Sequence, residues 1–213
     1  MLASSAGGVY GGSDASPITE STPPAPISAY GHAKLASEAS LAEWARDRTN
    51  VSTLVARFSN LYGPEQRLDK PQGLISHMSR SSIYGAPVHV YVSLDTIRDF
   101  LFAEDAARGL VLGLRRLADC NVQHVTKIYA SERAVSIAGL VAAFRHIARR
   151  RLRIVSGLAP ATALQPRRLQ FRSQVWASLR ERQVELIEGV SRVYAHQLAL
   201  FRRGLLPAPP IRR

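Results

Sequence analysis

Apolar positions recur at helical spacing in some segments of the chain and form short continuous runs in others, and the two kinds of segment alternate. Helical spacing is found in residues 28–48, 74–83, 103–117, 134–149 and 186–201. Short runs rich in β-branched residues predict buried strands at 51–58, 88–92, 123–129 and 152–155. Proline and glycine indicate loops at 12–27 and 60–73. Because helices and strands alternate, the pattern predicts an α/β fold whose strands are mostly parallel.

Composition is that of a chain able to bury a domain-sized core. The sequence has 213 residues, of which 46% are hydrophobic. No apolar run approaches the roughly 20 residues that a membrane span needs, and the N-terminus lacks the charged segment of a secretory signal. A single cysteine, Cys120, excludes an internal disulfide. These features predict a cytoplasmic protein without membrane contact, in which Cys120 is buried and inert.

The net charge of +12 raises the question of a polyanionic partner. Much of the excess lies late in the chain, as in Arg167-Arg168 and Arg202-Arg203, at the expected ends of helices and in the tail. It does not form one stripe interleaved with aromatic residues. This distribution favours a solvated basic surface, and a nucleic-acid-binding protein is kept as the least favoured alternative.

Candidate chemistry begins with Tyr30 and Lys34 in the first predicted helix. Residues four apart on a helix project from one face. An ammonium beside a phenol favours the phenolate, so this spacing predicts a lowered pKa for Tyr30 and a proton-transfer role. Ser4 and Ser5 stand about 25 residues upstream and could hold the hydroxyl on which it acts. The alternatives are a solvated helix pair and serines that only cap a turn.

Four segments carry a family resemblance. They are Ser-Ser-Ala-Gly-Gly-Val-Tyr-Gly at 4–11, Pro-Ile-Ser-Ala-Tyr-Gly-His-Ala-Lys-Leu at 26–35, Arg-Phe-Ser-Asn-Leu-Tyr-Gly-Pro-Glu-Gln at 57–66, and Ile-Arg-Asp-Phe at 97–100 with Glu104-Asp105. In this order they resemble the extended short-chain dehydrogenase/reductases, specifically the NAD-dependent epimerase/dehydratase family of nucleotide-sugar enzymes. The likeness to UDP-glucose 4-epimerases is strongest, and it is looser after about residue 120.

The resemblance implies roles for four residues near the N-terminus. Tyr30 corresponds to the family's catalytic base and Lys34 to its partner, which also binds the nicotinamide ribose. Ser5 corresponds to the hydroxyl that orients the substrate alcohol, and Ser4 competes with it for that role. Ser4, Tyr30 and Lys34 are the expected contacts to NAD.

A second group of residues is implied in binding the nucleotide sugar. Asn60 matches an asparagine that contacts the substrate, and the backbone of Gly73 and Leu74 falls where relatives meet the nucleotide. Arg98 matches an arginine that grips the pyrophosphate, for which a planar fork of donors is well suited. Two alternatives remain: Asn60 is an ordinary turn residue, and Arg98 forms a surface ion pair with Asp99. The six scattered histidines show no metal-ligand spacing, so no metal is expected.

The activity that follows is that of an NAD-dependent nucleotide-sugar epimerase. Tyr30 would take a proton from a ring hydroxyl while hydride passes to NAD, and a UDP-sugar is the favoured substrate. Dehydratases of the family add an acidic pair beside the serine, where this chain has Ala6-Gly7-Gly8, so an epimerase is favoured. Family members often dimerise through the tyrosine-bearing helix, and a homodimer through residues 28–48 is left open.

One departure bears on activity. The sequence contains no Gly-x-x-Gly-x-x-Gly motif for the dinucleotide phosphates. It opens where the fifth strand of the family should end, which predicts that roughly a hundred N-terminal residues are absent. We therefore expect one truncated domain, with residues 1–60 and 97–130 forming a Rossmann-like remainder and 61–96 and 131–213 a substrate-binding lobe. An inactive structural or pairing remnant is the main alternative to the enzyme.

Overall fold

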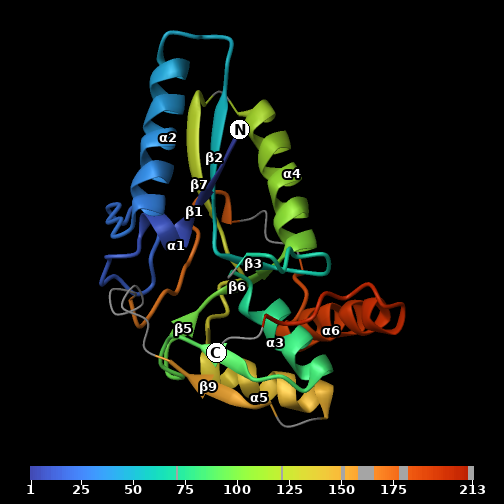
Figure 1. The fold of residues 1–213 in the computed structure, drawn as a ribbon. Coiled ribbons are helices and arrows are strands. Elements are labelled where there is room, and N and C mark those ends of the chain that lie inside the picture. The colour runs from blue at the N-terminus through green and yellow to red at the C-terminus, as the bar shows by residue number, and fades with distance from the viewer. Residues whose placement is uncertain (71, 121, 150–151, 158–165, 178–181, 211–213) are drawn as a thin grey trace.

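A three-stranded parallel sheet forms the upper half of the molecule (Figure 1). The computed structural model describes residues 1–70, 72–120, 122–149, 152–157, 166–177 and 182–210. The strands are β1 (Leu2–Ser5), β2 (Thr53–Phe58) and β7 (His124–Tyr129), in the order β1-β2-β7. Their register aligns Ser5 with Phe58 and Phe58 with Tyr129, so the carboxyl ends of all three strands reach one edge.

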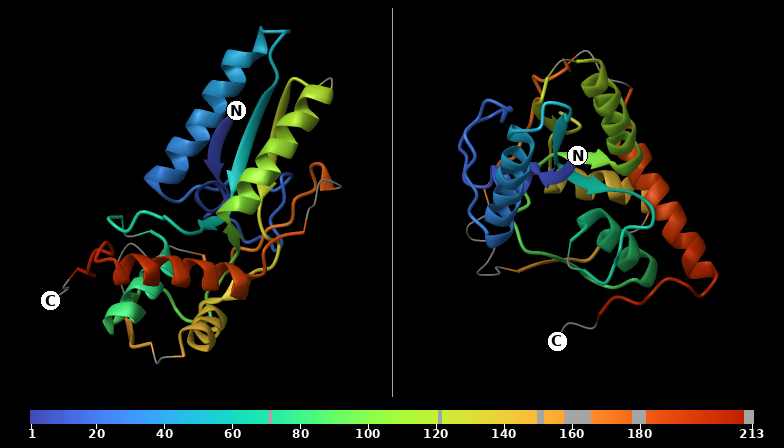
Figure 2. Two further views of the ribbon diagram at one scale, coloured as in Figure 1. Left: turned by 90° about the vertical axis from the view of Figure 1, so that its right-hand side faces the viewer. Right: turned by 90° about the horizontal axis from the view of Figure 1, so that it is seen from above.

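Two long helices cover this sheet. Helix α2 (Ala29–Arg46) packs along β1 and β2, and α4 (Ala103–Asp119) packs along β2 and β7 on the other side (Figures 1 and 2). The central strand β2 is therefore buried along nearly its whole length. A strand covered on both faces reads as a continuous apolar run, which is why this segment was recognisable from the sequence.

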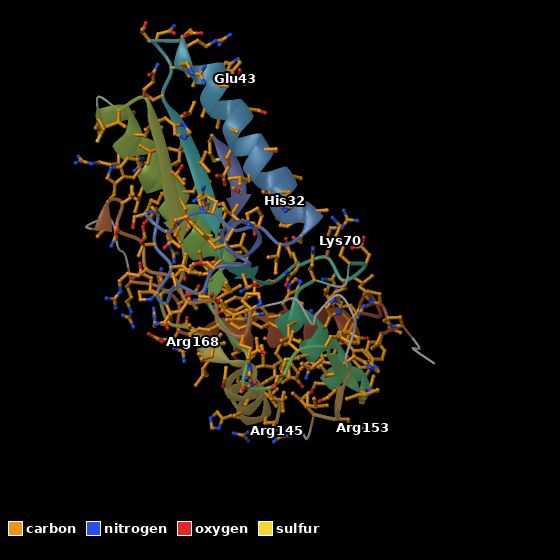
Figure 3. All side chains as sticks on the ribbon, turned by 90° about the vertical axis from the view of Figure 1, so that its left-hand side faces the viewer. His32, Glu43, Lys70, Arg145, Arg153 and Arg168 are labelled. Atoms are coloured by element: carbon orange, nitrogen blue, oxygen red, sulfur yellow. The ribbon has the colours of Figure 1, made fainter. Side chains whose placement is uncertain are left out.

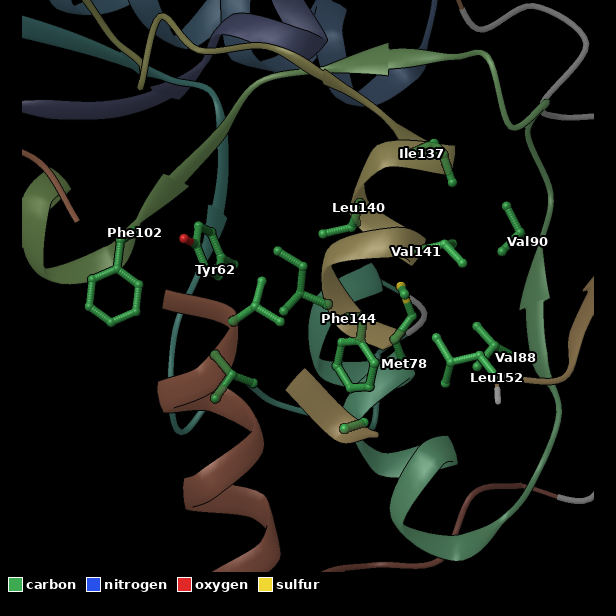
Figure 4. Close-up of a cluster of buried hydrophobic side chains, with 14 residues drawn as sticks. Tyr62, Met78, Val88, Val90, Phe102, Ile137, Leu140, Val141, Phe144 and Leu152 are labelled. Carbon is green, nitrogen blue, oxygen red and sulfur yellow. The ribbon is translucent and has the colours of Figure 1, made fainter. Parts of the chain in front are cut away.

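A second lobe lies below the sheet in Figure 1 and has its own core. It contains α3 (Leu74–Tyr84), α5 (Ile137–Ala148) and α6 (Leu186–Arg202), with β4 (Val88–Val90) parallel to β9 (Ile154–Ser156). Figure 4 shows the core, in which Phe144 of α5 lies beside Met78 of α3. Apolar faces of the three helices thus pack against one another rather than against the sheet.

Short elements connect the two parts. Helix α1 (Ala6–Val9) follows β1 directly, β3 (Asn60–Tyr62) pairs in parallel with β6 (Phe100–Phe102), and β5 (Ile97–Arg98) pairs antiparallel with β8 (Val135–Ser136). Residues 166–177 return to the upper half, where Phe171 forms a bridge with Ile18 and is fully buried.

The structure corrects several boundaries. Residues 60–62, predicted as loop, form β3, because pairing with β6 supplies hydrogen bonds that local sequence does not reveal. The helix predicted at 134–149 begins at Ile137, since Val135 and Ser136 pair with β5 and the Ser136 hydroxyl caps the helix. Strand β4 ends at Val90 rather than at residue 92, and β9 begins at Ile154 rather than at residue 152.

Cys120 is also placed differently from the expectation. It lies just beyond the C-terminus of α4 and is partly exposed rather than buried. The predicted assignment of residues 169–171 to the substrate-binding lobe does not match their packing, because Leu169 and Phe171 pack with Ala6 and Tyr10 at the sheet. The overall division into two functional lobes stays a prediction. Across the residues that the structure describes, none of the helices has the length and apolar character needed to cross a membrane.

The core of the second lobe yields a stability prediction. Phe144 is fully buried in that core. Replacing it in a Phe144→Ala variant should lower the free energy of unfolding by about 3–5 kcal/mol, because the change loses apolar burial and leaves a cavity. Urea denaturation measures the effect. The control is Val111→Ala on the exposed side of α4, which should change the value by less than about 0.5 kcal/mol, and equal losses in the two variants would contradict the packing described here.

Candidate active site

The two serines at the end of β1 face different partners. Successive side chains of a strand point to opposite faces. The Ser5 hydroxyl accepts a hydrogen bond from the Gly8 backbone N–H at 3.1 Å and so caps α1, which leaves its own proton available to another acceptor. The hydroxyl of Ser4 is buried and donates to Glu38 Oε1 at 2.5 Å. Ser5 is therefore better placed than Ser4 to orient a substrate hydroxyl.

The first turn of α2 lies directly against the loop that follows β1. The Ser28 hydroxyl caps this helix by accepting from the Gly31 N–H at 3.1 Å. A Cβ at position 31 would lie 2.2 Å from the backbone carbonyl oxygen of Gly8. This distance is too short for any side chain to be accommodated there. Glycine at position 31 is thus required for the close approach of α2 to the serine loop, which brings the preceding side chain, Tyr30, to that loop.

Tyr30 and Ser5 meet at Gly8, and Lys34 lies over the Tyr30 ring. A Cβ on Gly8 would lie 3.0 Å from Tyr30 Cε1 and 3.3 Å from Ser5 Oγ, so the phenol ring and the hydroxyl flank the same residue. Lys34 Nζ lies 5.8 Å from the centre of the Tyr30 ring and donates to the Ala3 carbonyl at 3.0 Å. Tyr30 is 54% exposed. The half-exposed Tyr30 ring therefore lies close to both the Lys34 ammonium and the Ser5 hydroxyl, and Lys34 is anchored to β1 rather than simply solvated.

A buried ion pair holds this helix on the sheet. Glu38 lies one further turn along the face that carries Tyr30 and Lys34, and Arg57 comes from β2. The Arg57 guanidinium binds the Glu38 carboxylate through Nη2 at 2.5 Å and Nε at 3.1 Å, and both residues are more than nine-tenths buried. Because Ser4 also donates to Glu38, one carboxylate joins α2 to both β1 and β2.

Tyr10 completes this network from the other side. Arg57 Nη1 donates to the phenol oxygen of Tyr10, and the guanidinium carbon lies 5.0 Å from the centre of its ring. Burial raises the pKa of Tyr10 despite the nearby positive charge. Burial alone would lower the pKa of Arg57, but the hydrogen bond to Glu38 and the negative charge of that carboxylate help to outweigh it, and the pKa is raised. Arg57 is therefore held charged in the interior.

A cleft of about 1660 Å³ runs from the serine loop to the second lobe. All of the site residues predicted from the sequence line it: Ser4, Ser5, Tyr30, Lys34, Asn60, Gly73, Leu74 and Arg98. The structure thus brings together five stretches that are separated by up to 94 positions in the chain. Their roles toward a substrate or a cofactor stay predictions.

The residues predicted to bind the nucleotide occupy distinct parts of the wall. Asn60 begins β3, and its side-chain amide donates to the Asp99 carbonyl at 2.8 Å, so it is not a turn residue. Gly73 has φ of 95° and precedes the first residue of α3, Leu74. A side chain at position 73 would be strained by this backbone angle and would also meet Gln66 at 2.7 Å.

Arg98 is buried rather than part of a surface ion pair. It is 9% exposed, and burial lowers its pKa to about 10. Asp99 is fully buried, and its carboxylate accepts from the backbone and the hydroxyl of Ser131 at 2.8 and 2.9 Å. The surface-pair alternative for Arg98 and Asp99 is therefore wrong, because neither side chain is at the surface.

Sequence reasoning missed the network of Glu38, Arg57 and Tyr10. Two signals could have revealed it: the spacing of Glu38 four residues after Lys34, and a charged residue inside an otherwise apolar strand. Among the residues described by the structure, no group of three or more histidine, cysteine, aspartate or glutamate side chains could hold a metal ion.

Comparison with known proteins gives a consistent family signal. The model of the NAD dependent epimerase/dehydratase family matches residues 1–128. A dTDP-glucose 4,6-dehydratase from Neisseria gonorrhoeae is 40% identical over 93 residues, which are 44% of this chain and 26% of that protein. The family match begins at residue 1, so it gives no support to the expected absence of an N-terminal segment.

Solved structures share the fold over nearly the whole chain. The UDP-glucose 4-epimerase of Thermotoga maritima, solved with UDP-glucose, matches 95% of this chain and 63% of its own, with a TM-score of 0.82 and 23% identity. MoeE5, solved in complex with UDP-glucose and NAD, matches 95% of this chain and 64% of its own, with a TM-score of 0.77 and 27% identity. The chain thus spans about a quarter of the curated dehydratase and somewhat less than two thirds of these structures.

The buried ion pair yields a prediction that separates it from surface charges on the same helix. A Glu38→Gln variant should lower the free energy of unfolding by about 3–5 kcal/mol, because it leaves the Arg57 charge buried without a counter-charge. The matched control is Glu43→Gln, at the exposed Glu43 labelled in Figure 3. This change should shift the free energy of unfolding by about 0.5 kcal/mol or less. Chemical denaturation of both variants measures the difference, and similar midpoints would refute the anchoring role of Glu38.

Proposed function

The chain belongs to the NAD-dependent epimerase/dehydratase family, and we propose that it acts on a UDP-sugar as a 4-epimerase. The observation that carries the proposal is that Tyr30 and Ser5 flank Gly8 at the wall of the cleft, with Lys34 over the Tyr30 ring. A half-exposed phenol beside a fixed ammonium and a free hydroxyl proton is equipped to take a proton from a sugar alcohol and to return it.

Each of these groups has a distinct task in the proposed reaction. Ser5 donates a hydrogen bond to the substrate oxygen and orients it toward the phenol. Tyr30 accepts the hydroxyl proton at its phenol oxygen and returns it after the sugar has turned over. Lys34, held by the Ala3 carbonyl, places its positive charge over the Tyr30 ring. Positioning of these groups accounts for much of the rate enhancement.

The chain fits the nicotinamide end of NAD. Lys34 and Tyr30 are the residues that would hold the nicotinamide ribose, because their polar groups lie together at the cleft. Ser4, the third predicted contact, has its hydroxyl directed to Glu38. For the pyrophosphate end, the sequence offers no Gly-x-x-Gly-x-x-Gly turn. When bound, NAD supplies the acceptor and donor of the hydride.

The rest of the cleft suits a nucleotide sugar. Its volume exceeds the roughly 300–1,000 Å³ that is usual for a single small-molecule site, so it has room for more than one ligand. Asn60, the Gly73-Leu74 backbone at the N-terminus of α3, and Arg98 provide an amide, peptide N–H groups and a guanidinium along one wall. These groups match the sugar, the nucleotide and the pyrophosphate respectively.

A dehydratase is the second candidate, because the curated relative described above is a dTDP-glucose 4,6-dehydratase. Loss of water from a sugar needs an acidic group next to the reacting carbons, in addition to the tyrosine. The residues after Ser5 are Ala6, Gly7 and Gly8. Among the described residues that line the cleft, Asp69 is the one carboxylate, and it is exposed and paired with Arg67. The epimerase is therefore favoured.

The proposal predicts that turnover depends on the phenol of Tyr30. With NAD supplied, the chain should interconvert UDP-glucose and UDP-galactose, and Tyr30→Phe should lower kcat by about 10²–10⁴-fold because it removes the proton acceptor. Binding of UDP-glucose, measured by titration calorimetry, should change less than twofold. The matched control is His32→Gln, two residues along the same helix at the exposed His32 shown in Figure 3, which should retain full activity.

Two results would go against the proposal. A Tyr30→Phe variant that kept the activity of the unaltered chain would exclude Tyr30 as the base. An unaltered chain that neither bound UDP-glucose nor turned it over would favour the alternative of a non-catalytic member of the family.

A further inference from the structure

Arg80 is a buried cation that the sequence motifs do not explain. It lies on α3, is 5% exposed, and lines the same cleft as Arg98. Its Nη2 donates to His77 Nδ1 at 3.0 Å and its Nη1 to the Leu68 carbonyl at 3.4 Å. Its Nε has no hydrogen-bond partner among the described residues. Both partners of the guanidinium are neutral acceptors, since a histidine nitrogen that accepts a hydrogen bond carries no proton of its own.

The absence of a counter-charge separates Arg80 from Arg57, another of the buried arginines. Arg57 is compensated by the carboxylate of Glu38. In the part of the chain that the structure describes, no carboxylate forms an ion pair with Arg80, and burial lowers its pKa. Enclosing a cation without an anion is costly to folding. Such a residue on the wall of an open cleft is suited to an anion that arrives from outside.

The surroundings of Arg80 are held in place without a ligand. His77 Nε2 bonds the Lys70 carbonyl at 2.8 Å, and the Ser76 hydroxyl donates to Gln66 Oε1 at 2.8 Å. These bonds fasten the loop before α3 to the helical turn that precedes Arg80, so an incoming group would meet a preformed wall. The nearby carboxylate, that of Asp69, pairs with Arg67 at 2.6 Å.

We propose that Arg80 anchors a second anion-binding subsite in the cleft, in addition to Arg98, and that it takes a phosphate or carboxylate oxygen of a bound ligand. The guanidinium fork matches the geometry of either group. His77 and Lys70, which also line the cleft, flank the subsite. The inference deepens the proposed function by adding a second recognised charge, and it rests on the cleft being the ligand site rather than on the hydride chemistry.

Titration calorimetry at fixed ionic strength tests the subsite with three probes: UDP, inorganic pyrophosphate and uridine. An Arg80→Met variant should bind UDP or pyrophosphate at least tenfold more weakly than the unaltered chain, and uridine equally well. The matched control is Arg145→Met, which removes the same charge from the exposed end of α5, away from Lys70 and the cleft (Figure 3). It should leave all three affinities unchanged.

The two anionic probes distinguish the source of the anion. Weakening of UDP binding assigns the subsite to the diphosphate of the nucleotide, whereas weakening of pyrophosphate binding alone assigns it to a separate oxyanion. Either result supports the subsite. If Arg80→Met and Arg145→Met bind both anions as the unaltered chain does, or if the unaltered chain binds neither, the proposal is overturned.

Thermal unfolding separates a binding role from a structural one. Removing an uncompensated buried cation should leave the melting temperature of the ligand-free protein unchanged or higher, and UDP should protect the Arg80→Met variant less than the unaltered chain. A lower melting temperature with unchanged probe affinity would overturn the proposal. Loss of epimerase turnover in the unaltered chain with Arg80-dependent anion binding retained would reject the proposed function and leave this inference standing.

Discussion

Glu38 of α2 and Arg57 of β2 form the buried ion pair on which the placement of the candidate catalytic helix depends. Ser4 of β1 donates to the same carboxylate, so a single side chain ties the helix to two neighbouring strands. On the same face of α2, Lys34 lies one turn before Glu38 and Tyr30 lies two turns before it. Fixing Glu38 therefore also fixes the direction in which the phenol and the ammonium point, and the missing side chain at Gly31 allows them to reach the serine loop.

The cleft follows from how the two halves of the molecule meet. Parallel strands end at one edge of the sheet, which places Ser5 and the chain after Phe58 side by side. The second lobe then contributes the opposite wall through α3, and β5 contributes Arg98. The buried arginines Arg57 and Arg80 differ in whether a carboxylate balances their charge. Arg57, inside the upper half, has its own carboxylate, whereas Arg80, at the cleft wall, has only neutral partners.

Much of the site could be predicted from local sequence, because its chemistry is carried by short motifs. The Tyr30–Lys34 spacing, the serines before a glycine pair and the αL glycine ahead of α3 each act within a few residues of chain. The prediction failed where long-range pairing decides the outcome. Residues 60–62, predicted as loop, became a strand only through β6, and Cys120, predicted to be buried, is partly exposed at the end of α4.

The amino-acid sequence alone determined the family and the alternation of helices and strands, and it nominated the phenol, ammonium and hydroxyl of the candidate site, since these depend on residue type and spacing along the chain. Only the tertiary structure decided that the Ser4 hydroxyl belongs to Glu38 while that of Ser5 stays available, and that Arg80 is buried without an acid. Those properties depend on desolvation and on partners distant in the chain, and both arise only when the elements have packed together.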